Sequence, residues 1–329
     1  MSGGRRPTVT TASVVVVTYR RPDHVRTCLQ HLAQQTTTPV RVIVVDASPE
    51  TATEDVVREF PGVEYRRNDR GVGTTATSRA IGIADITEDV AAFVDDDAFA
   101  HPTWLEKLLE PYSDPAVVAV GGRALNAQPN EADRGIGEIG LLLPDGRLTG
   151  FFAADPGKIV EVDHMLGANM SVRLDAVRAV GGIRDLYPGT CLREESDIAL
   201  RLRRRGGRIV YTPFAVVRHV VGAYARGRRF DSRYRYFGAR NHVVLLVTTL
   251  GWRDPHVRRY ARTAVRTALD DARDGVRNAR RRTGFVDRAK GLAGGIRRSG
   301  LDLIGTSAGF ISALRANSAI KKSARTAVR

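Results

Sequence analysis

The sequence predicts an α/β protein with a doubly wound, mostly parallel sheet, followed by a basic helical extension. Three observations support this fold class. Short valine-rich runs alternate with helical patterns over the first 125 residues, and these runs are almost continuously apolar, as in parallel strands buried on both faces. The charge then changes sign: residues 1–200 hold 20 Lys and Arg against 29 Asp and Glu, whereas residues 201–329 hold 31 against 7.

The N-terminal part is predicted to contain five strands, at 13–17, 40–45, 63–65, 90–94 and 117–120. Pro22 suits the first turn of a helix, and Val25, Cys28 and Leu29 follow it at helical spacing. Pro102 opens another helix after the fourth strand. Because ligands of open α/β sheets bind beyond the carboxyl ends of the strands, polar residues at those ends are the candidate site.

The middle of the chain is predicted to leave the sheet and then return to it. Its proline and glycine content indicates a loop over 126–160. We then expect a strand at 166–172, helices at 174–180 and 194–205, and a strand at 209–211. We therefore divide the chain into three parts, residues 1–125, 126–230 and 231–329.

From about residue 231 the chain is expected to be helical and basic. A narrow apolar stripe lies among the arginines: Val257, Ala261, Ala264, Ala268, Ala272, Val276 and Ala279. The Gly, Ser, Ala and Arg content of 283–329 predicts a loosely ordered tail. A cationic helix of this kind suits an anionic membrane leaflet, with a solvated arginine-rich helix as the alternative. We expect no nucleic acid partner, because the region has no recognised motif and few aromatic residues.

Three consecutive aspartates, Asp95, Asp96 and Asp97, follow directly on the fourth predicted strand. Carboxylates this close repel one another unless a cation, a basic group or water compensates them. Because side chains alternate along an extended chain, Asp95 and Asp97 converge on one face while Asp96 points away. Such oxygens suit Mg²⁺ or Mn²⁺, which take further ligands from substrate phosphates. The first hypothesis is a metal site, and the alternative is a solvated acidic turn.

Other polar residues stand at the ends of the first two strands and on a later helix. Thr18, Tyr19 and Arg20 end the first strand, and Asp46 ends the second. Such residues can bind a nucleobase or a ribose, although Asp46 is equally suited to start a turn. Arg79 follows a glycine-containing segment and can hold a diphosphate. That segment matches neither a P-loop nor a dinucleotide fingerprint.

Together these motifs resemble those of glycosyltransferase family 2, whose nucleotide-binding domain has the fold called GT-A. The resemblance spans about residues 13–250. Five segments carry it in order: SVVVVTYRRPD, VIVVDASPE, the aspartate triplet in place of the DxD motif, LGANMSVR, and CLREESDIALRLRRRGG. The chain departs from the family at Arg20 and Ala80, where many members have asparagine.

The resemblance implies roles for the donor-side residues. Asp46 would bind the base, Arg79 the diphosphate, Asp95 the ribose or the metal, and Asp97 the metal and the diphosphate. Thr18, Tyr19, Arg20 and Asp96 would complete the nucleotide-sugar site. His219 stands where some members place a third metal ligand, and a structural histidine is the alternative.

The resemblance also implies the acceptor side and the general base. Asn169 and Glu194 would face the acceptor. The family pattern Glu-Asp-x-Asp maps onto Glu194 to Asp197, with Glu195 at the usual base position. Asp197 competes for that role, and it can instead pair with Arg201 four residues later on the helix.

The expected function is metal-dependent, inverting transfer of a sugar from a nucleoside diphosphate to a hydroxyl of a glycan or lipid-linked acceptor. Residues 1–125 would bind the nucleotide sugar, residues 126–230 would bind the acceptor and catalyse, and residues 231–329 would form the basic extension. The alternatives are a sugar-phosphate nucleotidyltransferase and a nucleic-acid or membrane scaffold. Two cysteines far apart in the sequence predict a cytoplasmic protein, and no apolar run reaches spanning length. The basic C-terminal region is the reason to expect a peripheral position on the inner membrane face.

Overall fold

The computed structural model of the protein describes residues 10–220 and 231–326, and only the backbone of 321–326. The described residues form two compact units. The sheet unit contains 10–142, 148–185 and 194–220. The helical unit contains 143–147, 186–193 and 231–326.

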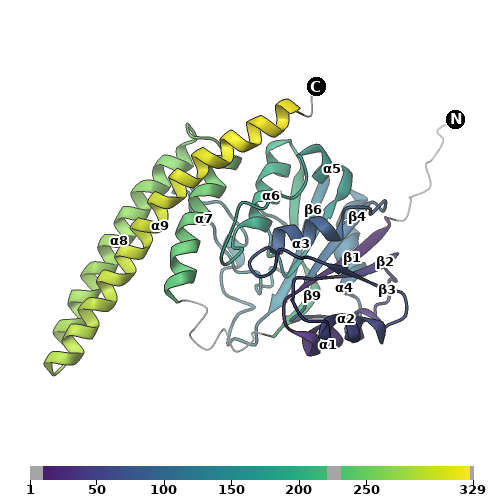
Figure 1. Cartoon of the computed structure of the whole chain (residues 1–329), viewed down its shortest axis with the longest axis horizontal. Coiled ribbons are helices and arrows are strands. Elements are labelled where there is room, and N and C mark those ends of the chain that lie inside the picture. The colour runs from purple at the N-terminus through teal and green to yellow at the C-terminus, as the bar shows by residue number, and fades with distance from the viewer. Residues whose placement is uncertain (1–9, 221–230, 327–329) are drawn as a thin grey trace. The chain divides into compact units, whose positions relative to one another are not determined.

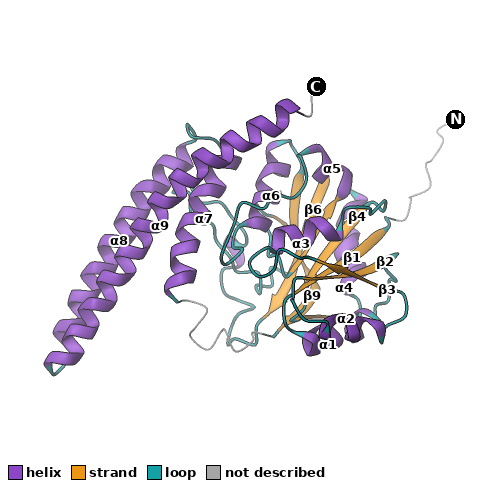
Figure 2. Ribbon diagram, viewed as in Figure 1, coloured by secondary structure: helices purple, strands orange, loops and turns teal. Residues whose placement is uncertain are grey.

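The sheet unit has the predicted α/β class (Figure 2). Its strands are β1 (Ala12–Thr18), β2 (Arg41–Asp46), β3 (Val63–Arg67), β4 (Val90–Asp95), β5 (Ala98–Ala100), β6 (Val117–Leu125), β7 (Val160–Glu161), β8 (Asn169–Arg173) and β9 (Arg208–His219). Its helices are α1 (Pro22–Leu32), α2 (Ala52–Arg58), α3 (Thr75–Gly82), α4 (Trp104–Leu109), α5 (Leu174–Ala179) and α6 (Glu194–Arg204), with short 3₁₀ turns at Glu110–Ser113 and Ile136–Glu138.

The strands form one mixed sheet in the order β3-β2-β1-β4-β8-β6-β9-β5, and β7 also pairs with β9. Strands β1 to β4 are parallel, as predicted, and so are β6 and β9. Strand β8 is antiparallel to both of its neighbours. In the register of the parallel half, Thr18 lies opposite Asp46 and Val17 opposite Asp95. The polar ends of β1, β2 and β4 therefore meet at one edge of the sheet.

Alternating valines of β1 divide the core into two layers. Val14 and Val16 pack in the layer with buried side chains of α1, α2 and α4. Val15 and Val17 pack in the other layer, with buried residues of α5 and α6. Because both faces are covered, the apolar runs show little of the polar alternation of a half-exposed strand.

The helical unit contains α7 (Ser232–Thr249), α8 (Pro255–Arg281) and α9 (Phe285–Thr326), with α8 and α9 side by side (Figure 1). The prediction of a loosely ordered tail over 283–329 was wrong for the described residues, because α9 is one long helix; residues 327–329 lie outside the description. The glycines that indicated disorder line close helix contacts. A Cβ on Gly295 would lie 2.5 Å from Gly275 Cα of α8, and one on Gly305 would lie 2.5 Å from the Tyr236 carbonyl of α7.

The apolar stripe predicted on α8 is partly used within the unit. Val257, Ala264 and Ala268 are buried. Val276, from the same stripe, is exposed. Within residues 10–220 and 231–326, no helix combines the length and the apolar composition that crossing a bilayer requires.

Candidate functional site

The aspartate triplet and His219 meet at the carboxyl edge of the parallel strands. Asp95 ends β4, Asp97 lies in the turn after it, and β5 then pairs with β9 so that Ala98 lies opposite His219. One ligand atom each from Asp95, Asp97 and His219 lies within 4.8 Å of the others. Two carboxylate oxygens and an imidazole nitrogen are a donor set that suits Mn²⁺ at least as well as Mg²⁺.

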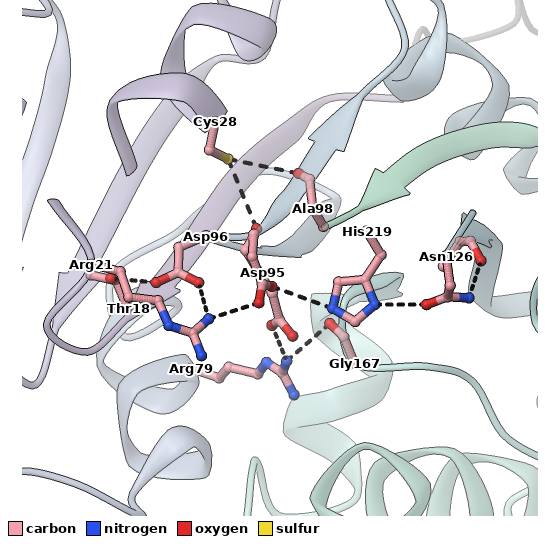
Figure 3. A network of polar contacts seen from close by, with 12 residues as sticks. Thr18, Arg21, Cys28, Arg79, Asp95, Asp96, Ala98, Asn126, Gly167 and His219 are labelled. Carbon is pink, nitrogen blue, oxygen red and sulfur yellow. Dashed lines mark hydrogen bonds and ion pairs between the residues drawn. The ribbon is translucent and has the colours of Figure 1, made fainter. Parts of the chain in front are cut away.

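His219 is oriented by Asn126, which follows β6. The Asn126 Oδ1 atom lies 3.1 Å from Nδ1 of the imidazole, while the Asn126 amide nitrogen donates to the Ala124 carbonyl (Figure 3). The Nε2 atom of His219 lies 3.3 Å from Asp97 Oδ1. A hydrogen bond on one ring nitrogen fixes the ring and the tautomer of a ligating histidine, so Asn126 leaves Nε2 directed at the carboxylates.

Arg21 forms ion pairs with Asp96 and Asp97 of the triplet, and Thr18 donates a hydrogen bond to Asp96. Arg21 Nη1 donates to Asp96 Oδ1 at 3.0 Å and to Asp97 Oδ2 at 2.7 Å, and Thr18 donates to Asp96 at 2.7 Å. Burial raises the pKa of Asp96 to about 7 against the opposing effect of Arg21. Burial also acts to raise the pKa of Asp97, but His219 and Arg21 together hold it below its usual value. Asp97 thus stays ionised while Asp96 is a buried, hydrogen-bonded neighbour.

Arg79 joins the triplet to the start of α6. Its side chain is almost completely buried and donates to Asp95 Oδ1 at 3.2 Å and to the Gly167 carbonyl at 2.9 Å. Its other terminal nitrogen forms an ion pair with Glu194. Arg79 therefore bridges two other predicted site residues, Asp95 and Glu194, and holds the Asp95 carboxylate in place.

The three acids in the first turn of α6 have three different surroundings. Glu194 is buried against Arg79. Asp197 is fully buried, and Arg201 Nε donates to its Oδ2 at 2.6 Å, which is the structural alternative that the sequence left open. Glu195 is half-buried, and its Oε1 accepts a hydrogen bond of 3.3 Å from Ser196. Of the three, Glu195 is the carboxylate with solvent access.

The end of β2 forms a second polar cluster around Asp46. The buried Asp46 carboxylate accepts hydrogen bonds from the backbone and hydroxyl of Ser48, at 2.8 and 2.5 Å, and from the Tyr65 hydroxyl at 3.2 Å. Burial and the Asp46 charge raise the pKa of Tyr65 to about 12. A surface hollow opens beside this cluster, lined by Arg20, Pro22, Ser48, Glu50, Ala52 and Thr53.

Two of the predicted binding residues are engaged elsewhere in the protein. Arg20 is exposed, pairs with Glu50 at 2.7 Å and has a φ of 56°, so Arg21 is the arginine that reaches the triplet. Asn169 is fully buried. Its Oδ1 accepts from Trp104 Nε1 at 2.8 Å, and its Nδ2 donates to two backbone carbonyls at 2.9 and 3.0 Å. These bonds favour a structural role for Asn169 over contact with an acceptor.

Sequence reasoning missed Arg21, Asn126 and Tyr65 at this site. Arg21 had a signal, because it stands in the same motif as Arg20 and directly precedes the helix. Asn126 had none, since only the parallel pairing of β6 with β9 brings it beside His219. Tyr65 lies on the predicted strand 63–65, but its place beside Asp46 depends on the pairing of β3 with β2, which was not predicted from the sequence.

The sequence profile described as Glycosyl transferase family 2 matches residues 13–173. A Haloferax volcanii protein named glucosyl-dolichyl phosphate glucuronosyltransferase is 30% identical over 224 residues, which are 64% of this chain and 70% of that protein. A Mycobacterium tuberculosis protein named pre-mycofactocin glycosyltransferase is 31% identical over 184 residues, 55% of this chain and 37% of that protein.

A solved structure is similar over most of the chain. It is the mannosyltransferase PcManGT from Pyrobaculum calidifontis in complex with GDP-Man and Mn²⁺, with a TM-score of 0.59 and 18% identity. The match covers 94% of this chain and 88% of that one. At this identity the similarity concerns the fold.

Proposed function

Because this chain belongs to glycosyltransferase family 2 and has a GT-A type sheet, we propose that it catalyses metal-dependent, inverting transfer of a sugar from a nucleoside diphosphate to an acceptor hydroxyl. One observation carries the proposal. Asp95, Asp97 and His219 converge at the strand edge, and Arg79 connects Asp95 to the segment that holds Glu195. The charge-bearing groups of both substrates thus have candidate partners at one edge of the sheet.

Asp95, Asp97 and His219 would hold a divalent cation. Their chemistry fits one, because hard carboxylate oxygens and an imidazole are common ligands of Mn²⁺ and Mg²⁺. The ion, when bound, would neutralise the negative charge that develops on the leaving diphosphate. The Mn²⁺ and GDP-Man in the complex of the Pyrobaculum calidifontis mannosyltransferase support this assignment.

Arg21 and Arg79 would act on the same end of the donor in different ways. Arg21 lies partly exposed, so its guanidinium has access to a diphosphate placed beside Asp97. Arg79 is buried and engaged with Asp95, Glu194 and the Gly167 carbonyl, so it would position Asp95 and leave the diphosphate to other groups. This modifies the role that the family resemblance implies for Arg79.

Glu195 would be the general base. Inverting transfer with in-line attack requires a carboxylate that takes the proton of the acceptor hydroxyl, and such a base contributes about 10²–10⁴-fold to a rate. Asp197 is fully buried in its ion pair with Arg201, which leaves it without access to an acceptor. The ion pair of Glu194 with Arg79 would hold the first turn of α6 against the metal end of the site.

The nucleoside would lie over the ends of β1 and β2. Thr18 and Asp96 form a hydrogen-bonded pair there, and the hollow beside Ser48 borders the cluster of Asp46. Tyr19 is half-buried and can pack on a base. Asp46 holds the loop after β2 through Ser48, and it would contact the base where Tyr65 now donates to it.

The acceptor would be a glycan or a lipid-linked sugar. The name of the Haloferax volcanii relative, a glucuronosyltransferase of glucosyl-dolichyl phosphate, supports a lipid-linked acceptor. A cytoplasmic protein, peripheral on the membrane, would meet such an acceptor where nucleotide sugars are present. Family membership sets aside the sugar-phosphate nucleotidyltransferase and a purely scaffolding protein.

A donor screen tests the proposal. The purified protein with Mn²⁺ is incubated with UDP-, GDP- and dTDP-sugars, and slow hydrolysis and thermal stabilisation are measured. We expect at least one donor to be hydrolysed, and the Asp97→Asn variant to lose at least about a hundredfold of that rate. The matched control is Asp114→Asn, a partly exposed acid paired with Arg208 away from the site. Hydrolysis of no donor, or hydrolysis that Asp97→Asn leaves intact, would contradict the proposal.

A further inference from the structure

Helix α9 buries small residues and exposes large apolar ones. Its apolar face consists of Leu292, Ile296, Leu303, Ile304, Ile311 and Leu314, which are 40–61% exposed. Apart from the adjacent pair Leu303 and Ile304, successive positions are three, four or seven residues apart, so they gather on one side of the helix. A helix stabilised only by packing in a soluble protein would turn these side chains inward.

The opposite side of α9 makes the contacts with α7 and α8. Gly291 and Gly295 approach α8, where an added Cβ would lie 3.1 Å from Ala279 N and 2.5 Å from Gly275 Cα. Gly305 and Gly309 approach α7 in the same way, 2.5 and 2.7 Å from backbone carbonyl oxygens. The helix is therefore held by close backbone contacts, and its apolar face is not needed for packing within the unit.

The turn between α8 and α9 extends the apolar surface. Every residue from 280 to 290 is exposed, and among them Phe285 is 87% and Val286 63% exposed. The same eleven residues contain five arginines and lysines and a single acid. Helix α8 adds Val265, Leu269 and Val276, each at least 39% exposed.

The charge around these side chains is strongly positive. Residues 255–329 contain 18 arginines and lysines and five acids, a net charge of +13. Four of the five acids are in ion pairs with arginines: Asp270, Asp271, Asp274 and Asp302. The acids of α8 and α9 can therefore neutralise only a minority of the positive charges in this region.

We propose that the apolar face of α9 and the basic α8–α9 turn bind the surface of an anionic lipid bilayer. Exposed Leu, Ile and Phe side chains would enter the headgroup region while the arginines contact lipid phosphates, as in interfacial amphipathic helices. The positive charge disfavours a second copy on the same surface, because two like-charged faces repel each other. The inference rests on the proposed function only in one respect, namely that the bilayer would then present a lipid-linked acceptor.

Vesicle co-sedimentation of the full chain tests this proposal. We expect binding to vesicles of phosphatidylcholine with phosphatidylglycerol, weaker binding to phosphatidylcholine alone, and weaker binding at high salt. The Ile296→Gln/Ile304→Gln/Ile311→Gln variant should bind at least about tenfold more weakly. The matched control carries Val40→Gln, Ile159→Gln and Phe214→Gln, three exposed apolar residues of the sheet unit, and should bind like the parent. Circular dichroism checks that both variants keep the parent's helix content.

Three results would overturn the proposal. The first is no binding to anionic vesicles, and the second is equal vesicle binding by the α9 variant and the parent. The third, measured by size exclusion with light scattering, is that the parent is a dimer and the α9 variant a monomer that still binds vesicles as the parent does. Donor hydrolysis in solution is measured separately. A protein that binds vesicles and hydrolyses no donor would contradict the proposed function and leave this inference standing.

Discussion

The two units use arginine and apolar residues in opposite ways. In the sheet unit, Arg79 and Arg201 are buried against acids, and the valines of β1 are enclosed on both faces. In the helical unit, Arg235 pairs with Asp271 and Asp302, but most arginines of α8 are exposed. The apolar face of α9 also points outward. The sheet unit is organised around an internal polar site and the helical unit around its outer surface.

The largest expected effect separates two acids that are two residues apart on α6. Glu195→Gln should lower sugar transfer by about 10²–10⁴-fold with little change in thermal stability, because the half-buried carboxylate is the proposed general base. Asp197→Asn should lower the free energy of unfolding by about 3–5 kcal/mol, because Arg201 would lose its buried partner. Turnover per folded molecule and thermal melting are measured for both. If Glu195→Gln kept its turnover while folded Asp197→Asn lost it, Asp197 would be the general base and Glu195 would not.

The second effect concerns Arg79. Arg79→Met should destabilise the sheet unit by about 3–5 kcal/mol, because the buried Glu194 carboxylate would be left uncompensated. Urea unfolding is followed through the buried Trp104 in a Trp252→Phe background. The control is Arg70→Met, which removes an exposed arginine and should cost less than about 0.5 kcal/mol. If both variants lost the same free energy of unfolding, the burial of the Arg79–Glu194 pair would not be what makes Arg79 important for stability.

The smallest effect uses adjacent residues of α9. Gly295→Leu should destabilise the helical unit by about 1–3 kcal/mol, because its side chain would collide with the backbone of Gly275. Ile296→Gln should change stability by less than about 0.5 kcal/mol. Trp252, which stacks on Phe310 with ring centroids 5.8 Å apart, reports the unfolding of this unit by fluorescence. A larger cost for Ile296→Gln than for Gly295→Leu would reverse the assignment of the two helix faces.

Sequence patterns predicted the sheet unit well for a physical reason. Valine runs buried on both faces have a strong signal, and parallel strands bring their carboxyl ends to one edge, so the neighbourhood of Thr18, Asp46 and Asp95 followed. The exact partners depended on side-chain direction and on pairing between distant strands. Thus Arg21, not Arg20, reaches the triplet, and Asn126 meets His219 across β6 and β9.

The helical unit was harder to predict because its composition supports two outcomes. A segment rich in glycine and alanine is typical of disorder when it is isolated, and of close helix contacts when a neighbouring helix is present. The Gly275 and Gly295 contact depends on α8 and α9 lying side by side, which local periodicity does not encode. The exposure of Ile296 and Ile304 likewise follows only once the packed side of α9 is known.

Electron spin echo spectroscopy of Mn²⁺ bound to the protein, with a nucleoside diphosphate present, tests the central claim most directly. We expect a nitrogen coupling that disappears in His219→Gln, together with a phosphorus coupling from the diphosphate. Asp97→Asn should abolish Mn²⁺ binding. A Mn²⁺ signal without nitrogen coupling, or one that Asp97→Asn leaves unchanged, would contradict the assignment of Asp95, Asp97 and His219 as the metal end of the donor site.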